Sequence, residues 1–197
     1  MSAIAAFDFD GTITNRDTFT GFLQYSFNCS TLIRKSLILM PTIILYWMKI
    51  VSSENAKQKC FSQFFQGMTQ KAFLQQCESY SLTQLKKHIR PVALERIHWH
   101  QNQGHEVIIV TASLAEWIKP WAHTENINIV IATIPEIKNG IVTGAFNSRN
   151  CKGIEKVNRF LEVFPERKTY TLYAYGDTIG DKNLLDFADN PYFQIFN

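Results

Sequence analysis

The chain contains 197 residues, of which 46% are hydrophobic and 19% are charged. This composition excludes a wholly disordered chain, and the length fits one domain with a large insertion or two small domains. The net charge of +3 is too small to indicate a nucleic-acid-binding protein. The four cysteines are far apart and form no CxxC pair, which argues against a zinc ribbon or a disulfide scaffold and indicates a reducing cytoplasm.

The chain begins with an apolar run, and similar runs recur later. Four such runs predict buried strands, at 2–9, 105–110, 127–133 and 169–175. Stretches with helical periodicity lie between the later runs, and Asn139-Gly140 predicts a hairpin with a type I′ turn. Strands that alternate with helices indicate βαβ units. The predicted fold is therefore α/β, with a Rossmann-like parallel sheet of at least four strands.

The segment 17–97 has a different pattern, without a convincing period-two strand. Phenylalanines and a methionine at 61, 64, 65 and 68 follow the i, i+3, i+4, i+7 spacing of one helix face. Four residues are predicted to cap helix N-termini: Ser53, Thr69, Ser81 and Ser113, the last in a capping box with Glu116. We therefore expect an all-helical insertion between the first and second strands.

Two pairs of acidic residues follow predicted strands. Asp8 and Asp10 come at the end of the first strand, where residues i and i+2 share a face and where α/β sheets bind ligands. Asp177 and Asp181 follow the run 169–175, and a capping box with Thr178 explains part of Asp181. In a parallel sheet Asp177 can converge with the first pair. Three acids without a His or Cys partner suit a hard cation such as Mg²⁺.

Four motifs in this order resemble those of the haloacid dehalogenase superfamily of phosphotransferases. They are Asp8-Phe-Asp10-Gly-Thr, Thr111 at a strand end, a lysine within 151–157, and Gly-Asp177-Thr-Ile-Gly-Asp. The resemblance is strongest to subfamily IB, the phosphoserine-phosphatase-like branch, and within it to the phosphatidylglycerophosphatase C group. It implies a core domain over 1–16 and 98–197 and a helical cap domain over 17–97.

The resemblance also implies roles for individual residues. Asp8 would be the nucleophile that forms an aspartyl phosphate, and Asp10 the general acid and base. Thr111, Ala112 and a lysine would bind the phosphoryl group; Lys156 is the favoured lysine and Lys152 the alternative. The predicted Mg²⁺ ligands are Asp8, Asp10 and Asp177, while direct or water-mediated contact by Asp181 stays open. Asp17 stands where phosphoserine phosphatases place the glutamate that binds the substrate amine, and has a shorter reach.

The substrate prediction depends on an uncharged stretch of the insertion. Residues 36–48 carry no charge, and no acid occurs between Asp17 and Glu54. As a helix the uncharged stretch is roughly 20 Å long, short of a ~30 Å hydrocarbon core, and Pro41 would kink it. Apolar residues with Tyr46 and Trp47, flanked by cations, are typical of an interfacial helix. The alternative is an apolar face that packs on other cap helices or on a second subunit.

Three functions are compatible with these observations. The first is hydrolysis of a lipid phosphate such as phosphatidylglycerophosphate by a cytoplasmic enzyme in peripheral contact with the inner membrane face. The second is a soluble phosphatase of small phosphorylated molecules, similar to phosphoserine phosphatase. The third is a non-catalytic scaffold that binds a membrane or a partner, which the intact set of acids and lysine disfavours. We expect no nucleic-acid partner, and the oligomeric state stays open.

Overall fold

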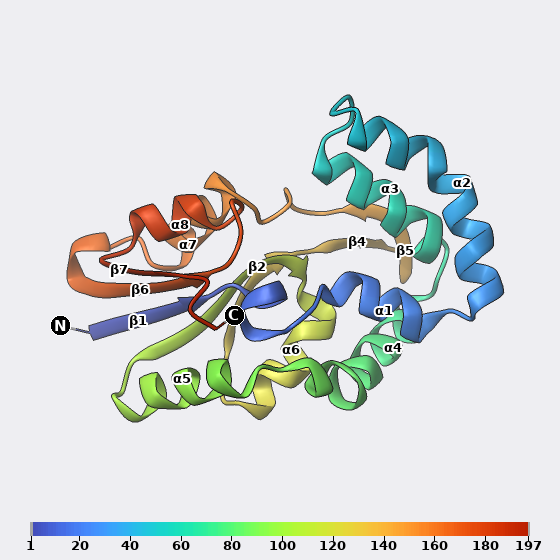
Figure 1. Cartoon of the computed structure of the whole chain (residues 1–197). Helices are drawn as coiled ribbons and strands as arrows, with labels where there is room; N and C mark the ends of the chain where they lie inside the picture. The colour runs from blue at the N-terminus through green and yellow to red at the C-terminus, as the bar shows by residue number, and fades with distance from the viewer. Residues whose placement is uncertain (1, 197) are drawn as a thin grey trace.

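The computed structural model describes residues 2–196, which form a parallel sheet covered by helices on both faces (Figure 1). The five strands lie in the order β3-β2-β1-β6-β7, and every neighbouring pair is parallel. Their bounds are β1 (Ser2–Phe7), β2 (Glu106–Leu114), β3 (Ile129–Thr133), β6 (Tyr170–Gly176) and β7 (Asn190–Phe193). The predicted α/β class and the four predicted strands are confirmed, and β7 is an additional edge strand.

Alternate residues of the central strand β1 point into two separate hydrophobic cores. Ala5 and Phe7 belong to the core with α5 (Pro91–Asn102) and α6 (Ala115–Thr124). Ile4 and Ala6 belong to the core with α7 (Ile154–Val163) and α8 (Lys182–Phe187). Burial on both faces explains why these strands are continuously apolar rather than alternating. It also leaves the carboxyl ends of β1, β2 and β6 as the sheet edge where polar residues can gather.

All regular elements between β1 and β2 are helical, as predicted. After the turn η1 (Phe9–Ile13), the helices are α1 (Thr18–Ser26), α2 (Cys29–Trp47), α3 (Ser53–Phe65), α4 (Gln70–Thr83), the short 3₁₀ helix η2 (Leu85–His88) and α5. Phe61, Phe64 and Phe65 are buried on α3 as predicted, whereas Met68, the fourth residue predicted for this face, lies beyond the end of the helix. The predicted domain boundary at 97/98 falls inside α5, and the division into core and cap stays a prediction.

The structure corrects three of the predicted helix caps and confirms one. Thr69 caps α4 as expected, but α3 is capped by Ser52 rather than Ser53. Ser81 lies inside α4, where its hydroxyl accepts a hydrogen bond from the Trp121 N–H. The capping box at Ser113 is wrong because β2 continues to Leu114, so Ser113 is still in the strand when α6 begins.

The predicted hairpin is present and joins the helical segment. It consists of β4 (Pro135–Lys138) and β5 (Ile141–Phe146), and both turn residues have positive φ, as a type I′ turn requires: 51° for Asn139 and 72° for Gly140. Backbone hydrogen bonds of 2.8–2.9 Å join residues 67–70 to residues 140–142. The hairpin therefore ties the α3–α4 connection to the later half of the chain.

Candidate active site

The chain turns sharply after β1, and the turn places two acidic residues on one cavity. Gly11 in this turn has a φ of 83°, and a Cβ at this position would collide with the carboxylate of Asp177. Glycine is therefore required there both by the backbone conformation and by the close approach of β6. Asp8 and Asp10 both line a cavity of about 420 Å³ at the carboxyl end of the sheet.

Lys156 connects two of the acidic residues. From α7, its ammonium donates to Asp8 Oδ1 and Asp181 Oδ1, each at 2.6 Å, and to the Val110 carbonyl at 2.7 Å. Burial opposes the charge of Lys156, but the two carboxylates outweigh it and hold its pKa above the ordinary value. Lys152, the alternative phosphate ligand, is exposed at the cavity rim. The buried position beside the predicted nucleophile thus belongs to Lys156.

Three carboxylates form a compact cluster that is suited to a hard cation. Asp8, Asp177 and Asp181 each offer an oxygen within 4.8 Å of the others. Burial raises the pKa of Asp8 and of Asp177, against the opposing effect of the Lys156 ammonium. The three carboxylates repel one another and offer only oxygen ligands. A divalent cation such as Mg²⁺ would relieve this repulsion, and it prefers oxygen ligands. The carboxylate of Asp10, a predicted ligand, is outside this cluster.

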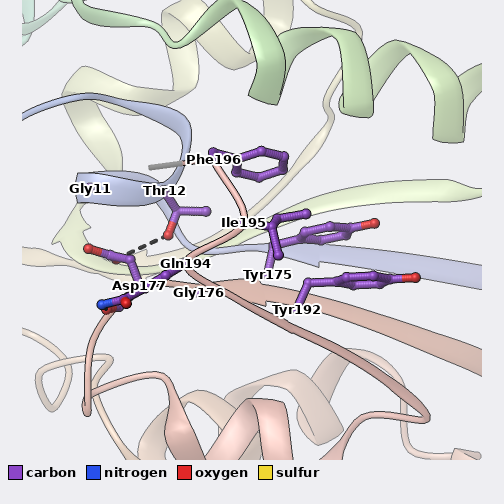
Figure 2. Close-up of a pocket in the computed structure, with 9 residues that line it drawn as sticks. All are labelled: Gly11, Thr12, Tyr175, Gly176, Asp177, Tyr192, Gln194, Ile195 and Phe196. Atoms are coloured by element: carbon purple, nitrogen blue, oxygen red, sulfur yellow. Dashed lines mark hydrogen bonds between the residues drawn. The ribbon is translucent and has the colours of Figure 1, made fainter.

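The hydrogen bonds within the cluster separate direct ligands from supporting residues. Asp181 uses both oxygens, Oδ1 for Lys156 and Oδ2 for the N–H and hydroxyl of Thr178. Asp177 Oδ1 accepts from the Thr12 hydroxyl at 3.1 Å (Figure 2), while its Oδ2 accepts no hydrogen bond from residues 2–196. Asp8 likewise keeps Oδ2 free of donors within this range. Asp8 and Asp177 are thus better placed than Asp181 to hold a cation directly.

The last residues of the described chain form hydrogen bonds with the backbone at Asp177 and pack beside it. Gln194, after β7, donates its side-chain amide to the Asp177 carbonyl at 2.9 Å and its backbone N–H to the Gly176 carbonyl. Phe196 stacks on Phe7 and Tyr175. Figure 2 shows this segment lying across the ends of β1 and β6. Sequence reasoning missed this support because nothing in the local pattern marks residues 194–196 as structural.

Asp10 is held apart from the cluster by two donors. Its Oδ1 accepts from the Thr18 N–H at 2.8 Å, and its Oδ2 accepts from the Ser113 hydroxyl. Burial and the neighbouring charge of Asp17 raise the pKa of Asp10, while the hydrogen bonds from Ser113 and Thr18 oppose this. A carboxyl group with a raised pKa facing a cavity is suited to donating a proton.

The remaining predicted site residues also reach the cavity. Thr111 is buried at the bottom, and its hydroxyl accepts from the Ser113 N–H at 3.1 Å. Ala112 contributes to the lining, and its carbonyl accepts from Thr133. Asp17 lies at the rim, where Oδ1 accepts from the Thr20 N–H at 2.7 Å and caps α1. Asp17 therefore has a structural role that needs no substrate, and its predicted amine contact stays a prediction.

Sequence reasoning missed a cation that enters the cavity from the helical segment. Lys57 of α3 donates to the Ala112 carbonyl and lies 5.9 Å from the centre of the Phe19 ring. Burial lowers its pKa, against the attraction of Asp10 and Asp17, and it forms no ion pair with any residue in 2–196.

Comparisons with known proteins agree with the fold and the motifs. The family model of haloacid dehalogenase-like hydrolases matches residues 5–186. Protein CicA of Caulobacter vibrioides is 31% identical over 202 residues, which cover 98% of this chain and 86% of that protein.

Solved structures share the fold at lower identity. A protein of unknown function from Bordetella pertussis Tohama I has a TM-score of 0.83 at 20% identity, covering 97% of this chain and 89% of its own. A phosphoserine phosphohydrolase-like protein from Francisella tularensis has a TM-score of 0.66 at 19% identity, covering 98% and 86%. A phosphoserine phosphatase, solved as a phospho-aspartyl intermediate analogue, has a TM-score of 0.61 at 16% identity, covering 95% and 83%. From the family match and the relative at 31% identity, it follows that this chain belongs to the haloacid dehalogenase-like hydrolases.

Proposed function

We propose that the protein hydrolyses phosphomonoesters through an aspartyl phosphate on Asp8. The observation that carries this proposal is the buried Asp8, which meets the cavity with one oxygen bound to Lys156 and the other free. That free oxygen would attack phosphorus while the bond to the leaving oxygen breaks. Asp10 would protonate the leaving oxygen and then take a proton from water, which attacks the aspartyl phosphate and releases inorganic phosphate and Asp8.

Other residues support the two steps. Lys156 and Thr111 would bind the non-bridging oxygens of the phosphoryl group, on which charge develops. Mg²⁺, which when bound neutralises charge on the phosphoryl group, would be held by the free oxygen of Asp177 and by the Asp8 oxygen that Lys156 also contacts, so the other Asp8 oxygen stays available for attack. The Asp10 carboxylate, directed at Thr18 and Ser113, serves proton transfer rather than the metal.

The test is covalent trapping of phosphate. With Mg²⁺ and an aryl phosphate, we expect wild type to turn over and to carry acid-stable label from a radioactive phosphoryl group. Asp8→Asn should do neither, whereas Asp10→Asn should still take up label from an activated leaving group. Label on Asp8→Asn would mean that the nucleophile is misassigned, and inactivity of wild type across a broad phosphate panel would favour the scaffold alternative.

We infer further that the substrate is a lipid phosphate, such as phosphatidylglycerophosphate, on an anionic membrane surface. The support is α2, in which Leu39 is the one buried residue, while Leu37, Ile38 and Trp47 are 64%, 60% and 76% exposed. It is also the one helix within residues 2–196 whose length and composition would allow it to cross a membrane, which by itself is weak support. The other helices of the chain leave this face of α2 exposed.

Lys57 supports a substrate with a second anionic group next to the phosphomonoester. A desolvated cation without a carboxylate partner is unfavourable until an anion neutralises it. The phosphodiester of phosphatidylglycerophosphate and the carboxylate of phosphoserine both meet this requirement. Lys57 therefore fits both remaining substrates, and α2 favours the lipid.

The two substrates can be separated by kinetics. We expect higher kcat/KM for phosphatidylglycerophosphate than for phosphoserine, and a further gain on anionic vesicles. Lys57→Met should lower kcat/KM for the preferred substrate about tenfold, while Lys59→Met, on an exposed side of the same helix, should leave it unchanged. Higher kcat/KM for phosphoserine without vesicle binding would replace the lipid proposal by the soluble phosphatase.

A further inference from the structure

The direction of the Asp10 side chain is set by hydrogen bonds rather than by the sheet. Asp10 lies in the turn after β1, with φ of −72° and ψ of 120°, beyond the last residue of the strand. Its two oxygens are held by donors from distant parts of the chain, the Thr18 N–H at the start of α1 and the Ser113 hydroxyl near the end of β2. Without these donors, rotation about the side-chain bonds would move the carboxyl group relative to the cavity.

The hydroxyl of Ser113 belongs to a buried chain of donors that ends on Asp10. The Trp117 indole N–H can only donate, and it does so to Thr18 Oγ1 at 3.2 Å. Thr18 Oγ1 lies 3.3 Å from Ser113 Oγ. The Ser113 hydroxyl donates its single proton to Asp10 Oδ2, so towards Thr18 it can only accept, and the Thr18 hydroxyl donates to Ser113. Ser113, Thr18 and Trp117 are all at most 2% exposed, so water does not compete for these bonds.

We propose that Ser113 is a positioning residue, which fixes the Asp10 carboxyl group so that it can transfer a proton to the leaving oxygen. This inference rests on the proposed phosphatase function. The hydroxyl acts through Asp10 and is not itself required to touch the substrate. Its loss would leave Oδ1 bound to Thr18 but free the second oxygen, and the carboxyl group would sample directions in which the proton cannot reach the leaving oxygen.

A positioning role for Ser113 predicts a dependence of kcat/KM on the leaving group that a purely structural role would not produce. A poor leaving group needs a proton in the transition state, whereas a highly acidic leaving group departs without one. The value of kcat/KM reports the steps up to the first irreversible one, which is formation of the aspartyl phosphate. Misplacement of Asp10 should therefore lower kcat/KM for phenyl phosphate and spare 2,4-dinitrophenyl phosphate, an aryl phosphate whose leaving group is far more acidic.

The experiment compares these two substrates across matched variants. We expect Ser113→Ala to lower kcat/KM for phenyl phosphate about tenfold and for the dinitrophenyl ester less than about threefold. Ser113→Cys, which keeps the volume with a weak donor, should show the same selective loss if the alanine variant folds poorly. Ser113→Thr keeps the hydroxyl and should restore wild-type values within about threefold. Ser81→Ala removes another buried, hydrogen-bonded serine hydroxyl and should change neither substrate.

A double variant shows whether the effect passes through Asp10. In the Asp10→Asn background, adding Ser113→Ala should cause no further loss on phenyl phosphate, because the group that it positions is already gone. Equal losses on both substrates, or additive losses in the double variant, would overturn the proposal. A selective loss for Asp10→Asn without one for Ser113→Ala would overturn this inference alone. An inactive wild type would overturn the proposed function and this inference together.

Discussion

His100 is a buried titratable group that lies outside the site. It is fully buried, its Nε2 lies 2.7 Å from the Tyr175 hydroxyl, and its Nδ1 lies 2.8 Å from His105 Nδ1. Burial lowers its pKa to about 4, and the charges of His105 and Arg96 act in the same direction. In the unfolded chain the pKa of this imidazole is about 6.5. Between these values the unfolded state binds more protons, so the free energy of unfolding falls as the pH falls through this window.

We therefore expect His100→Gln to be less sensitive to mild acid than wild type. From pH 7 to pH 5, wild type should lose up to about 2 kcal/mol more unfolding free energy than the variant, measured by urea denaturation at both pH values. Glu116, whose pKa burial raises to about 7, titrates with the opposite sign in both proteins and cancels in the difference. Parallel losses in the two proteins would contradict the neutral state of His100.

Asp177 carries the second prediction at this scale. Asp177→Ala removes one of the two carboxylate oxygens that accept no hydrogen bond in the cluster, so Mg²⁺ should bind at least about tenfold more weakly. Two measurements check this: the Mg²⁺ dependence of aryl phosphate hydrolysis, and the rise in melting temperature that Mg²⁺ alone causes. Asp186→Ala, which removes an exposed carboxylate paired with Lys182, is the control. An unchanged Mg²⁺ dependence would contradict a metal role for Asp177.

At the residue scale, the sequence reveals the functional residues that belong to a recognisable local motif. Asp8, Asp10 and Asp177 could be found because each follows a strand end that an apolar run predicts. Ser113 and Lys57 could not, since their function depends on which partner tertiary packing brings within 3 Å. The sequence pattern places Ser113 at a helix cap, because serine followed by glutamate three residues later looks the same in a capping box and at the end of a strand that leads into a helix.

At the scale of elements, α2 is notable because many of its large apolar side chains are exposed to solvent. Its exposed large side chains run along almost its whole length and continue past its end to Met48 and Ile50. Arg34 and Lys49 add positive charge, and Lys35 donates to the Gln63 and Phe64 carbonyls and so anchors α2 to α3. An apolar surface with cations and no acid is suited to anionic lipid.

Polar substitutions on α2 should separate membrane binding from catalysis. Leu37→Gln together with Trp47→Gln should lower binding to anionic vesicles about tenfold or more, since each buried apolar side chain contributes roughly 1.5–3 kcal/mol. Aryl phosphate hydrolysis and melting temperature should not change. Ile154→Gln, at a 59% exposed position on α7, is the matched control. Unchanged vesicle binding, or a dimer in solution that the substitutions dissociate, would point to a second subunit as the cover of α2.

Strand β7 illustrates why some elements are hard to predict. It has four residues, includes Pro191, and has alternating exposed and half-buried positions. A proline cannot donate to a sheet, so it is tolerated at an edge and argues against a strand when met in sequence. The central strands, by contrast, are apolar on both faces and long enough to be recognised.

At the scale of the whole molecule, early and late parts of the chain depend on each other. The central strand β1 pairs with β2, about 100 residues later, and with β6, about 170 residues later. Glu54 at the start of α3 accepts a hydrogen bond from the Asn150 N–H at 2.9 Å. The cavity is therefore completed by residues from both halves, and no half of the chain contains the site alone.

The hydrogen bonds between residues 67–70 and the hairpin have a consequence for the nascent chain. The first partners leave the ribosome some 70 residues before the second. At ~5–20 residues per second this interval lasts several seconds, whereas helices form within about a microsecond. During that time the hairpin that packs against α3 and α4 has not been made, so the phenylalanine side chains of α3 lack one of their partners. We therefore expect the speed of translation between residues 70 and 142 to affect the yield of folded protein.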